Sequence, residues 1–437
     1  MQSPAEQILT LYEDLGQTDY FGEPVSQLVH GLQAARLAQA AGADSELILA
    51  ALLHDIGHLC FADAEQMADV GVLQHEILGA CYLYFLGGST RLAELVAGHV
   101  DAKRYLIHKQ PEYARHLSEA SQITLGYQGG PMSAEEAKHF AAAPLFKDLL
   151  RLRAWDEAAK ESGSEKAWPE DLRQLIASGL QCDEPQVQAF AEQGYLHLPG
   201  FIPDFLLPAV LAAVDQFAAS ADAPGRWMKY YENTAKSRQL CRLENFIPFS
   251  ELLATLLTGP RLMHLLKPLF GEAAVLFKEK VNFKLPGGQG FAPHQDAPAF
   301  TSFDQDYHIT AMISLDDTRV SNGCLEICPG RWDKSLLPMT DQLTLAEDCV
   351  NSLDWQPLPT QAGDLVLFDS YIPHRSGVNQ TEGARRAIYA TYNARSAGSY
   401  REAYFQEKRQ AFPPDVERQP GVDYADPGVF NVGNPLD

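Results

Sequence analysis

The sequence lacks any long apolar run, and its seven cysteines form no Cys-x-x-Cys pair. No uninterrupted apolar stretch approaches the roughly 20 residues that a membrane-spanning helix needs. Scattered cysteines in an odd number, with Cys324 and Cys328 four apart in a strand-like segment, argue against a disulfide framework or a zinc site. Residues 1–10 show no signal-peptide pattern, because they already carry Glu6 and run into polar residues. We therefore expect a cytoplasmic protein with reduced thiols.

Positive charge is also scarce, since 34 Lys and Arg residues stand against 57 Asp and Glu, for a net charge of -23. This balance disfavours nonspecific binding to nucleic acid or to an anionic membrane. An anionic substrate must then be held by a few local Lys and Arg side chains. A hydrophobic content of 46% with 21% charged residues is typical of globular proteins. At 437 residues the chain is too long for one ordinary core, so we expect two domains.

The first expected domain, residues 1–182, has the periodicity of helices, and we predict an all-α bundle. The expected helices are one that begins at Pro24 and ends before Gly42, then 46–58 with Ser45 as its cap, 72–86, 91–106, 134–140 and 145–160.

A polar linker, 183–188, leads to the second expected domain, residues 189–437. After helices at 208–219 and 250–266, short runs rich in Val, Ile, Phe and Tyr predict strands. These are 275–285, 308–315, 325–327, 364–368 and 387–393. We expect a double-stranded β-helix (jelly roll) with flanking helices.

The helical half carries a set of metal-ligand side chains from several expected helices: His30, His54, Asp55, His58, His75, His99 and Asp156. His54 and His58 would share a helix face, and the Asp55 carboxylate can bridge two cations because it offers two oxygens. Nitrogen and oxygen ligands without thiolate fit iron or manganese better than structural zinc. The pattern predicts a dinuclear site inside a helical bundle. A metal-dependent phosphohydrolase, which also uses His-Asp with an outlying His and Asp, is the rival interpretation.

Further motifs narrow this choice. Tyr20-x-x-Glu23 lies seven residues before His30, and Lys103 lies four after His99. The run Leu117-Ser118-x-x-Ser121 is followed by Gln128-Gly129-Gly130-Pro131-Met132. On these residues, 1–180 resembles the HD-domain mixed-valent di-iron oxygenases that cleave carbon–phosphorus bonds in hydroxylated phosphonates, relatives of myo-inositol oxygenase.

The resemblance implies a ligand set for each of two irons, an Fe(II)/Fe(III) pair that reacts with O₂. One iron would take His30, His54, Asp55 and Asp156, and the other Asp55, His75 and His99. The resemblance also implies that Glu23, supported by Tyr20, is a ligand displaced by substrate. Lys103, Ser121 and Gln128 would contact the phosphonate, and His58 would lie beside the metals as a catalytic and substrate-binding group.

In the strand half, His294-x-Asp296 with the distant His374 forms a 2-His-1-carboxylate pattern. Two ligands at i and i+2 of a strand point to the same side. Such a triad leaves positions open and is typical of non-haem Fe(II) oxygenases. Arg385 follows His374 by eleven residues and can pair with the distal carboxylate of 2-oxoglutarate. Lys278, Lys280 and Lys284 lie on one face of the expected strand. This face is either exposed to solvent, or at least one of its ammonium groups contacts a phosphonate or the cosubstrate.

The opening 194–201 and the stretch 322–330 resemble the phytanoyl-CoA dioxygenase family, over about residues 188–400. More narrowly, 277–284 leading into 293–298 resembles the 2-aminoethylphosphonate hydroxylases. Arg331-Trp332 departs from the Ser-His that the family usually has after Pro-Gly. The resemblance implies one Fe(II) on the triad, with Arg385, Lys280 and Asn282 contacting 2-oxoglutarate.

Together the halves predict a bifunctional enzyme. The second domain would hydroxylate C1 of 2-aminoethylphosphonate or a close analogue, and the first would cleave the product to glycine, or its analogue, and phosphate. Trimethylaminoethyl and methyl phosphonates stay open as substrates. A quaternary ammonium group could stack against the aromatic rings of Trp227, Tyr230 and Tyr231. Alternatively, these residues belong to the core or to a lid. Two alternatives are a phosphohydrolase fused to a 2-oxoglutarate hydroxylase of unrelated substrate, and a regulatory HD module, against which the full ligand set argues.

Overall fold

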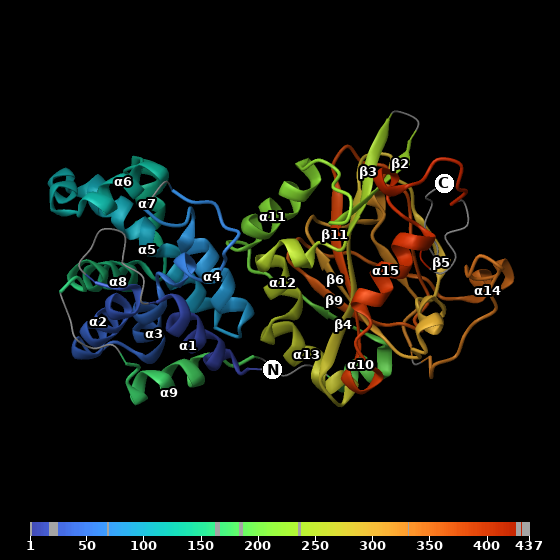
Figure 1. Cartoon of the computed structure of the whole chain (residues 1–437), viewed down its shortest axis with the longest axis horizontal. Helices are drawn as coiled ribbons and strands as arrows, with labels where there is room; N and C mark the ends of the chain where they lie inside the picture. Colours follow the sequence, from blue (N-terminus) through green and yellow to red (C-terminus); the bar gives the residue numbers. More distant parts are fainter. Residues whose placement is uncertain are drawn as a thin grey trace. The chain divides into compact units, whose positions relative to one another are not determined.

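The computed structural model describes residues 2–16, 25–67, 70–161, 167–182, 187–234, 237–330, 332–424 and 430. The chain divides into two compact units, Met1–Asp183 with Gly259–Arg261, and Glu184–Thr258 with Leu262–Asp437. Helices make up the first unit, and the strands belong to the second (Figure 1). Within the described residues no helix has the length and apolar character needed to cross a bilayer.

The first unit is the expected all-α bundle. Its helices are α1 Pro4–Leu15, α2 Gln27–Ala40, α3 Ser45–Leu53, α4 His75–Phe85, α5 Thr90–Lys109, α6 Glu119–Tyr127, α7 Ala134–Ala142, α8 Phe146–Ala158 and α9 Glu170–Gly179, with 3-10 helices at Ile56–His58 and Pro111–His116. The pairs α2–α3, α4–α5, α5–α8 and α2–α8 pack together. Their shared core is apolar and includes Leu32, Leu52, Leu95 and Leu152.

The expected helix over 46–58 is wrong in its second half. Asp44, rather than Ser45, caps α3 by accepting from the Leu47 backbone N–H at 3.0 Å. The helix ends at Leu53, and a 3-10 turn follows. Gly57 lies so close to the start of α4 that a Cβ would stand 1.8 Å from the His75 carbonyl oxygen. The turn therefore holds the residues after α3 against α4, and His54 and His58 do not share a regular helix face.

The second unit is built on two antiparallel sheets, as expected for a jelly roll. One has the order β1-β9-β6-β11-β4-β3-β2 and the other β5-β10-β7-β8. The strands are β1 Tyr195–Leu198, β2 Met228–Asn233, β3 Arg238–Glu244, β4 Ala274–Lys284, β5 Phe291–His294, β6 Ile309–Ser314, β7 Leu325–Ile327, β8 Gln356–Leu358, β9 Leu365–Asp369, β10 His374–Ser376 and β11 Arg385–Ala394. A buried cluster includes Met312, Val366 and Ala387 of the large sheet and Leu325 and Ile327 of the small one.

Helices flank these sheets. They are α10 Val187–Gln193, α11 Leu207–Ala219, α12 Glu251–Thr258, α13 Pro260–Phe270, α14 Glu347–Ser352 and α15 Arg401–Ala411. The single helix expected over 250–266 is two helices, because Pro260 has no N–H to continue α12 and instead begins α13. Helix α10 begins at Val187, so the last two residues of the expected linker 183–188 are helical. The remaining linker residues, 183–186, lie outside the described part of the chain.

Candidate metal centres

The helical unit gathers six of its expected ligands at one buried point, drawn from α2, the turn after α3, α4, α5 and α8. Two groups of three have ligand atoms within 4.8 Å of one another: His30, His54 and Asp156 in one group, and Asp55, His75 and His99 in the other. All six side chains are buried. Metal binding by these residues remains a prediction, and the geometry is what a pair of ions requires.

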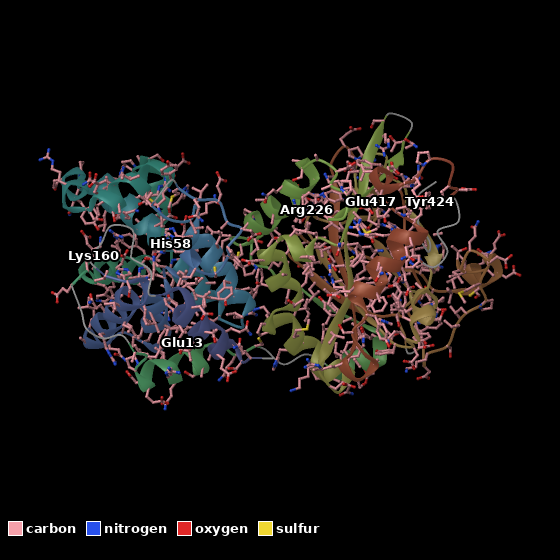
Figure 2. The ribbon with its side chains drawn as sticks, viewed as in Figure 1. Glu13, His58, Lys160, Arg226, Glu417 and Tyr424 are labelled. Atoms are coloured by element: carbon pink, nitrogen blue, oxygen red, sulfur yellow. The ribbon has the colours of Figure 1, made fainter. Side chains whose placement is uncertain are left out.

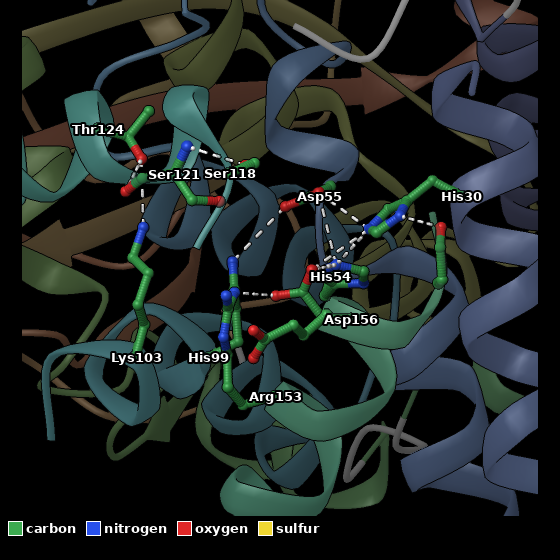
Figure 3. A network of polar contacts seen from close by, with 12 residues as sticks. His30, His54, Asp55, His99, Lys103, Ser118, Ser121, Thr124, Arg153 and Asp156 are labelled. Carbon is green, nitrogen blue, oxygen red and sulfur yellow. Dashed lines mark hydrogen bonds and ion pairs between the residues drawn. The ribbon is translucent and has the colours of Figure 1, made fainter. Parts of the chain in front are cut away.

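Asp55 stands between the two groups and turns one oxygen toward each (Figure 3). Its Oδ2 lies 3.6 Å from His30 Nε2 and 3.4 Å from His54 Nε2. Its Oδ1 lies 3.4 Å from His75 Nε2 and 3.5 Å from His99 Nε2. Because each oxygen faces a different histidine pair, the carboxylate is oriented to bridge two cations.

Backbone carbonyls orient three of these imidazoles. The Nδ1 atoms of His30, His54 and His99 lie 2.9, 2.9 and 2.7 Å from the carbonyl oxygens of Ala159, Ala51 and Val96. An imidazole that donates from Nδ1 to a carbonyl presents the lone pair of Nε2 as a ligand. The four Nε2 atoms also stand in close pairs, 3.1 Å apart for His30 and His54 and 3.2 Å apart for His75 and His99.

Arg153 of α8 fixes the second carboxylate. Its guanidinium donates to Asp156 Oδ2, which leaves Asp156 Oδ1 at 3.5 Å from His30 Nε2 and 3.7 Å from His54 Nε2. Burial alone would raise the pKa of Asp156, but Arg153 and the two histidines hold it well below the ordinary value. The pKa of Asp55 is likewise well below its ordinary value, because the imidazoles of His54 and His75 outweigh the effect of burial. Both carboxylates are therefore charged.

A polar pocket opens beside the two groups, and the expected substrate contacts line it. Lys103 is buried and donates from Nζ to Thr124 Oγ1 at 3.2 Å (Figure 3). Burial, followed by the charge of Arg153, lowers the pKa of Lys103 to about 8. Ser121 and Gln128 also line the pocket, and Gln128 Oε1 is buried without a hydrogen-bond partner among the described residues. These groups can receive a small oxyanion next to Asp55.

His58 lies inside the helical unit and lines the same pocket (Figure 2). It does not join either ligand group. Its ring stacks on His75 with centroids 4.0 Å apart, and its Nδ1 accepts from the Val72 backbone N–H at 3.1 Å. The two remaining expected residues of this site, Tyr20 and Glu23, lie outside the described residues.

The strand unit forms a second, separate cluster from His294, Asp296 and His374. His294 ends β5 and is paired directly with His374, which begins β10. Asp296 Oδ1 lies 3.7 Å from His294 Nε2 and 3.9 Å from His374 Nε2. The Nδ1 atoms of both histidines face carbonyl oxygens, of Ala292 at 2.7 Å and Ile372 at 3.1 Å, so Nε2 points to the cluster.

The expectation that His294 and Asp296 share a strand is wrong. Asp296 has helical backbone angles and precedes a 3-10 helix, Ala297–Phe303. The strand stops because Pro298 cannot donate to a ladder and the Ala297 N–H is bonded to the Ser370 carbonyl. Thr310, on β6, donates to Asp296 Oδ2 at 3.2 Å and so orients the carboxylate from the neighbouring sheet.

Lys280 and Asn282 line the pocket at this triad, as does Lys278. Lys284 does not, and instead donates to Ser376 Oγ at 2.8 Å and to the Gly377 carbonyl at 2.6 Å. Only two of the three alternating lysines therefore face the metal cluster.

Arg385 is fully buried at the start of β11, directly across from Lys284. Its Nε and Nη1 have no hydrogen-bond partner among the described residues, and Nη2 lies 3.5 Å from Tyr389 Oη. A buried guanidinium with two open donors suits a carboxylate. The residues therefore fit Fe(II) on the triad and the distal carboxylate of 2-oxoglutarate on Arg385.

The three aromatic residues considered for a quaternary ammonium do not line either pocket at the triad. Tyr230 stacks on Phe412 and donates to its carbonyl at 2.8 Å. Tyr231 donates to Asp222, and Trp227 packs edge-on against two phenylalanines. These residues are core and surface packing.

Three residues near the two sites were not predicted from the sequence: Arg153, Thr310 and Arg242. Arg242 lines a pocket beside the triad. Arg153 lies three residues before Asp156 on α8, a spacing that places the two on one helix face. That signal was available for Arg153. Thr310 and Arg242 became visible only once their strands were paired with neighbours.

Comparisons with known proteins agree with the division of the chain into a helical unit and a strand unit. Residues 190–387 match the family model described as phytanoyl-CoA dioxygenase (PhyH), and residues 28–125 match the HD domain. The chain is 44% identical over 256 residues to a 2-aminoethylphosphonate dioxygenase from Uncultured bacterium HF130_AEPn_1, covering 58% of this chain and 98% of that protein.

Two further relatives carry different names. A (1-hydroxy-2-(trimethylamino)ethyl)phosphonate dioxygenase (glycine-betaine-forming) from Leisingera caerulea is 41% identical over 156 residues, covering 36% of this chain and 79% of that protein. A hydroxymethylphosphonate dioxygenase from Gimesia maris is 39% identical over 167 residues, covering 37% of this chain and 82% of that protein.

Proposed function

Because the chain belongs to the phytanoyl-CoA dioxygenase family and also carries an HD domain, we propose that it degrades an organophosphonate by two successive oxidations at two metal centres. Its second unit is an Fe(II)- and 2-oxoglutarate-dependent dioxygenase resembling 2-aminoethylphosphonate dioxygenase. The observation that carries the proposal is the presence, in one chain, of a carboxylate-bridged double cluster and a separate 2-His-1-carboxylate cluster.

The first oxidation takes place at the triad. His294, Asp296 and His374 would hold Fe(II), which with 2-oxoglutarate and O₂ would supply the oxidant that converts a C–H bond at C1 to C–OH, with release of succinate and CO₂. Arg385 would pair with the distal carboxylate of the cosubstrate. Lys280 and Asn282 line the pocket at the triad and would orient the cosubstrate. The product is the 1-hydroxyphosphonate.

The second oxidation takes place in the helical unit. There the chain's two histidine–aspartate groups would hold an Fe(II)/Fe(III) pair, which with a second O₂ supplies a four-electron oxidation of the carbon bearing phosphorus. From 2-aminoethylphosphonate the final products are glycine and phosphate. Relatives named for 1-hydroxyphosphonates support this assignment, since their names describe the compound that the second unit would make.

The helical unit's own side chains have distinct tasks in this proposal. Lys103 and Ser121 bind the phosphonate oxygens, and Gln128 turns its unpartnered Oε1 toward the substrate hydroxyl or amine. His58 is neutral, because burial and the neighbouring His75 hold its pKa well below the ordinary value. With Nδ1 accepting from Val72, its proton is on Nε2, from which it can donate to substrate. Glu23, with Tyr20, stays assigned as the ligand that substrate displaces.

The proposal is tested by phosphorus NMR of the purified protein with Fe(II), ascorbate, 2-oxoglutarate, O₂ and 2-aminoethylphosphonate. We expect a transient 1-hydroxyphosphonate signal followed by phosphate, and neither signal when 2-oxoglutarate or O₂ is left out. If phosphate is instead released from phosphoesters without O₂, the helical unit is a phosphohydrolase. If 2-aminoethylphosphonate is not consumed but a trimethylaminoethyl or methyl phosphonate is, the proposed two-step reaction is kept and that phosphonate replaces 2-aminoethylphosphonate as the proposed substrate.

A further inference from the structure

Two pockets meet at the triad of the strand unit. One extends from the triad past Lys280 and Asn282 to Ser376 and Tyr389. The other is lined by Arg242, Glu244, Glu279, Tyr404 and Lys408 in addition to residues near the triad. The two pockets share Lys278, Lys280, His294 and Asp296. A metal on the triad would thus be approached from two directions, as a reaction of cosubstrate with substrate requires.

The second pocket is rich in buried positive charge. Arg242 of β3 is paired in register with Asn282 of β4, and Glu244 is paired with Lys280. This register carries the guanidinium of Arg242 to the same side of the sheet as the lysines of β4. Lys408 reaches the pocket from α15 and is fully buried.

The carboxylate of Glu244 is already engaged. It accepts from Lys408 Nζ at 2.7 and 2.6 Å, and its Oε1 lies 3.3 Å from Arg242 Nη1. Glu279 accepts from Arg401 and from the Ile247 backbone N–H. Both carboxylates therefore already have hydrogen-bond partners, although the charges of Glu244 and Asp296 still raise the pKa of Lys278 and Lys280 against the effect of burial.

Lys278 and Lys280 have no hydrogen bond or ion pair from their ammonium groups among the described residues. Their recorded contacts are with ring faces, of Phe300 and Tyr404 for Lys278 and of Phe291 and Tyr389 for Lys280. Burial lowers the pKa of both lysines, and the charges of Arg242 and Lys278 lower that of Lys280 further. Buried amines that have no hydrogen-bond acceptor among the described residues, next to a cluster of metal-ligand side chains, indicate a site completed by an anion.

We propose that Arg242 and Lys278 form the phosphonate-binding subsite of the hydroxylase, with the substrate in this pocket while 2-oxoglutarate occupies the other pocket beside Lys280 and Asn282. The inference rests on the proposed function and names the residues that select its substrate. The guanidinium of Arg242 and the amine of Lys278 lie on two adjacent strands and can donate to the oxygens of a phosphonate dianion. The position also matches the reaction, because the carbon to be hydroxylated is bonded directly to phosphorus. An anion subsite for that reaction must adjoin the metal, and Lys278 and Lys280 line the pocket together with Asp296.

Glu244 and Lys408 act as positioning residues. The Glu244 carboxylate holds Arg242 at the pocket wall, and Lys408 compensates the charge of Glu244.

The test is an anaerobic titration of the protein loaded with Fe(II) and 2-oxoglutarate. The titrants are ethylphosphonate and 2-aminoethylphosphonate, and binding is measured by calorimetry and by the change in the metal-to-cosubstrate charge-transfer band. Arg242→Gln and Lys278→Gln should each weaken phosphonate binding about 10- to 100-fold, the loss of one charge-assisted contact. Both variants should bind 2-oxoglutarate as the unchanged protein does. Arg238→Gln is the matched control, since Arg238 lies on the same strand, is half exposed and pairs with Asp415 at the surface.

Phosphonate affinity that is unchanged in both variants would overturn the subsite, as would a loss of 2-oxoglutarate affinity equal to the loss of phosphonate affinity. Lys278→Gln keeps the test decisive if Arg242→Gln fails to fold. If the unchanged protein binds ethylphosphonate but hydroxylates no phosphonate, the subsite stands and the proposed reaction fails. If it hydroxylates 2-aminoethylphosphonate while the variants bind normally, the reaction stands and the subsite fails.

Discussion

Replacing Arg153 with Met should weaken the helical metal centre while leaving the triad intact. Arg153 is buried and donates to Asp156 Oδ2, so Met removes the group that orients Asp156 toward His30 and His54. Loss of an outer partner of a metal ligand costs about 10- to 100-fold in metal affinity. This corresponds to about 1.4–2.7 kcal/mol. In the iron-free protein the loss of the buried Arg153–Asp156 ion pair should also lower the free energy of unfolding by about 3 kcal/mol.

The assay is equilibrium dialysis at buffered Fe(II), with bound iron counted per chain, followed by phosphate release from the 1-hydroxyphosphonate. Arg151→Met is the matched control, because Arg151 lies on the same helix and is 41% exposed at its side chain. Among the carboxylates in the described part of the chain it reaches only Asp148, at 3.4 Å. We expect the control to bind iron as the unchanged protein does, and hydroxylation of the parent phosphonate to survive in both variants. Full iron affinity and full phosphate release in Arg153→Met would refute the orienting role.

Four other substitutions separate the two centres. Asp156→Ala should stop phosphate release and leave hydroxylation intact. His294→Ala should abolish turnover of the parent phosphonate and leave turnover of its 1-hydroxy derivative unchanged. If both variants fold but fail on both substrates, the two centres do not catalyse separate steps. Lys103→Gln should raise the KM for the 1-hydroxyphosphonate about tenfold. In the unchanged protein the KM for the 1-hydroxyphosphonate should rise as the pH increases through about 8. Burial and Arg153 lower the pKa of Lys103 to about 8, and only the protonated amine attracts the dianion. A KM that stays constant from pH 7 to 9 would contradict this. Arg385→Gln should raise the KM for 2-oxoglutarate about tenfold or more and leave phosphonate affinity unchanged, as measured by cosubstrate titration.

The helical centre was largely predictable because its ligands are chemically distinctive and recur on separate amphipathic helices. The sequence alone indicated that His30, His99 and Asp156 belong together, and the structure brings them together. It did not indicate how Asp55 is aimed, because the direction of that side chain depends on a turn. The chain leaves α3 after Leu53, and the contact of Gly57 with α4 decides the direction in which Asp55 projects.

The strand half was predictable in its pattern and less so in its local geometry. The i, i+2 spacing of His294 and Asp296 suggested a shared strand, whereas Pro298 and the hydrogen bond from the Ala297 N–H to the Ser370 carbonyl turn the chain away. Arg242 was out of reach for another reason. A polar residue in a short strand has no evident partner until the register with β4 is known, and that register is a long-range property.

The most direct test of the two-centre account is the stoichiometry of a complete turnover, measured with an oxygen electrode, a succinate assay and phosphorus NMR on one sample. The account predicts two O₂ consumed and one succinate formed for each phosphate released from 2-aminoethylphosphonate. Starting from the 1-hydroxy derivative, it predicts one O₂ and no succinate per phosphate. Phosphate released from the 1-hydroxy derivative without O₂ consumption, or only with succinate formed, would contradict it.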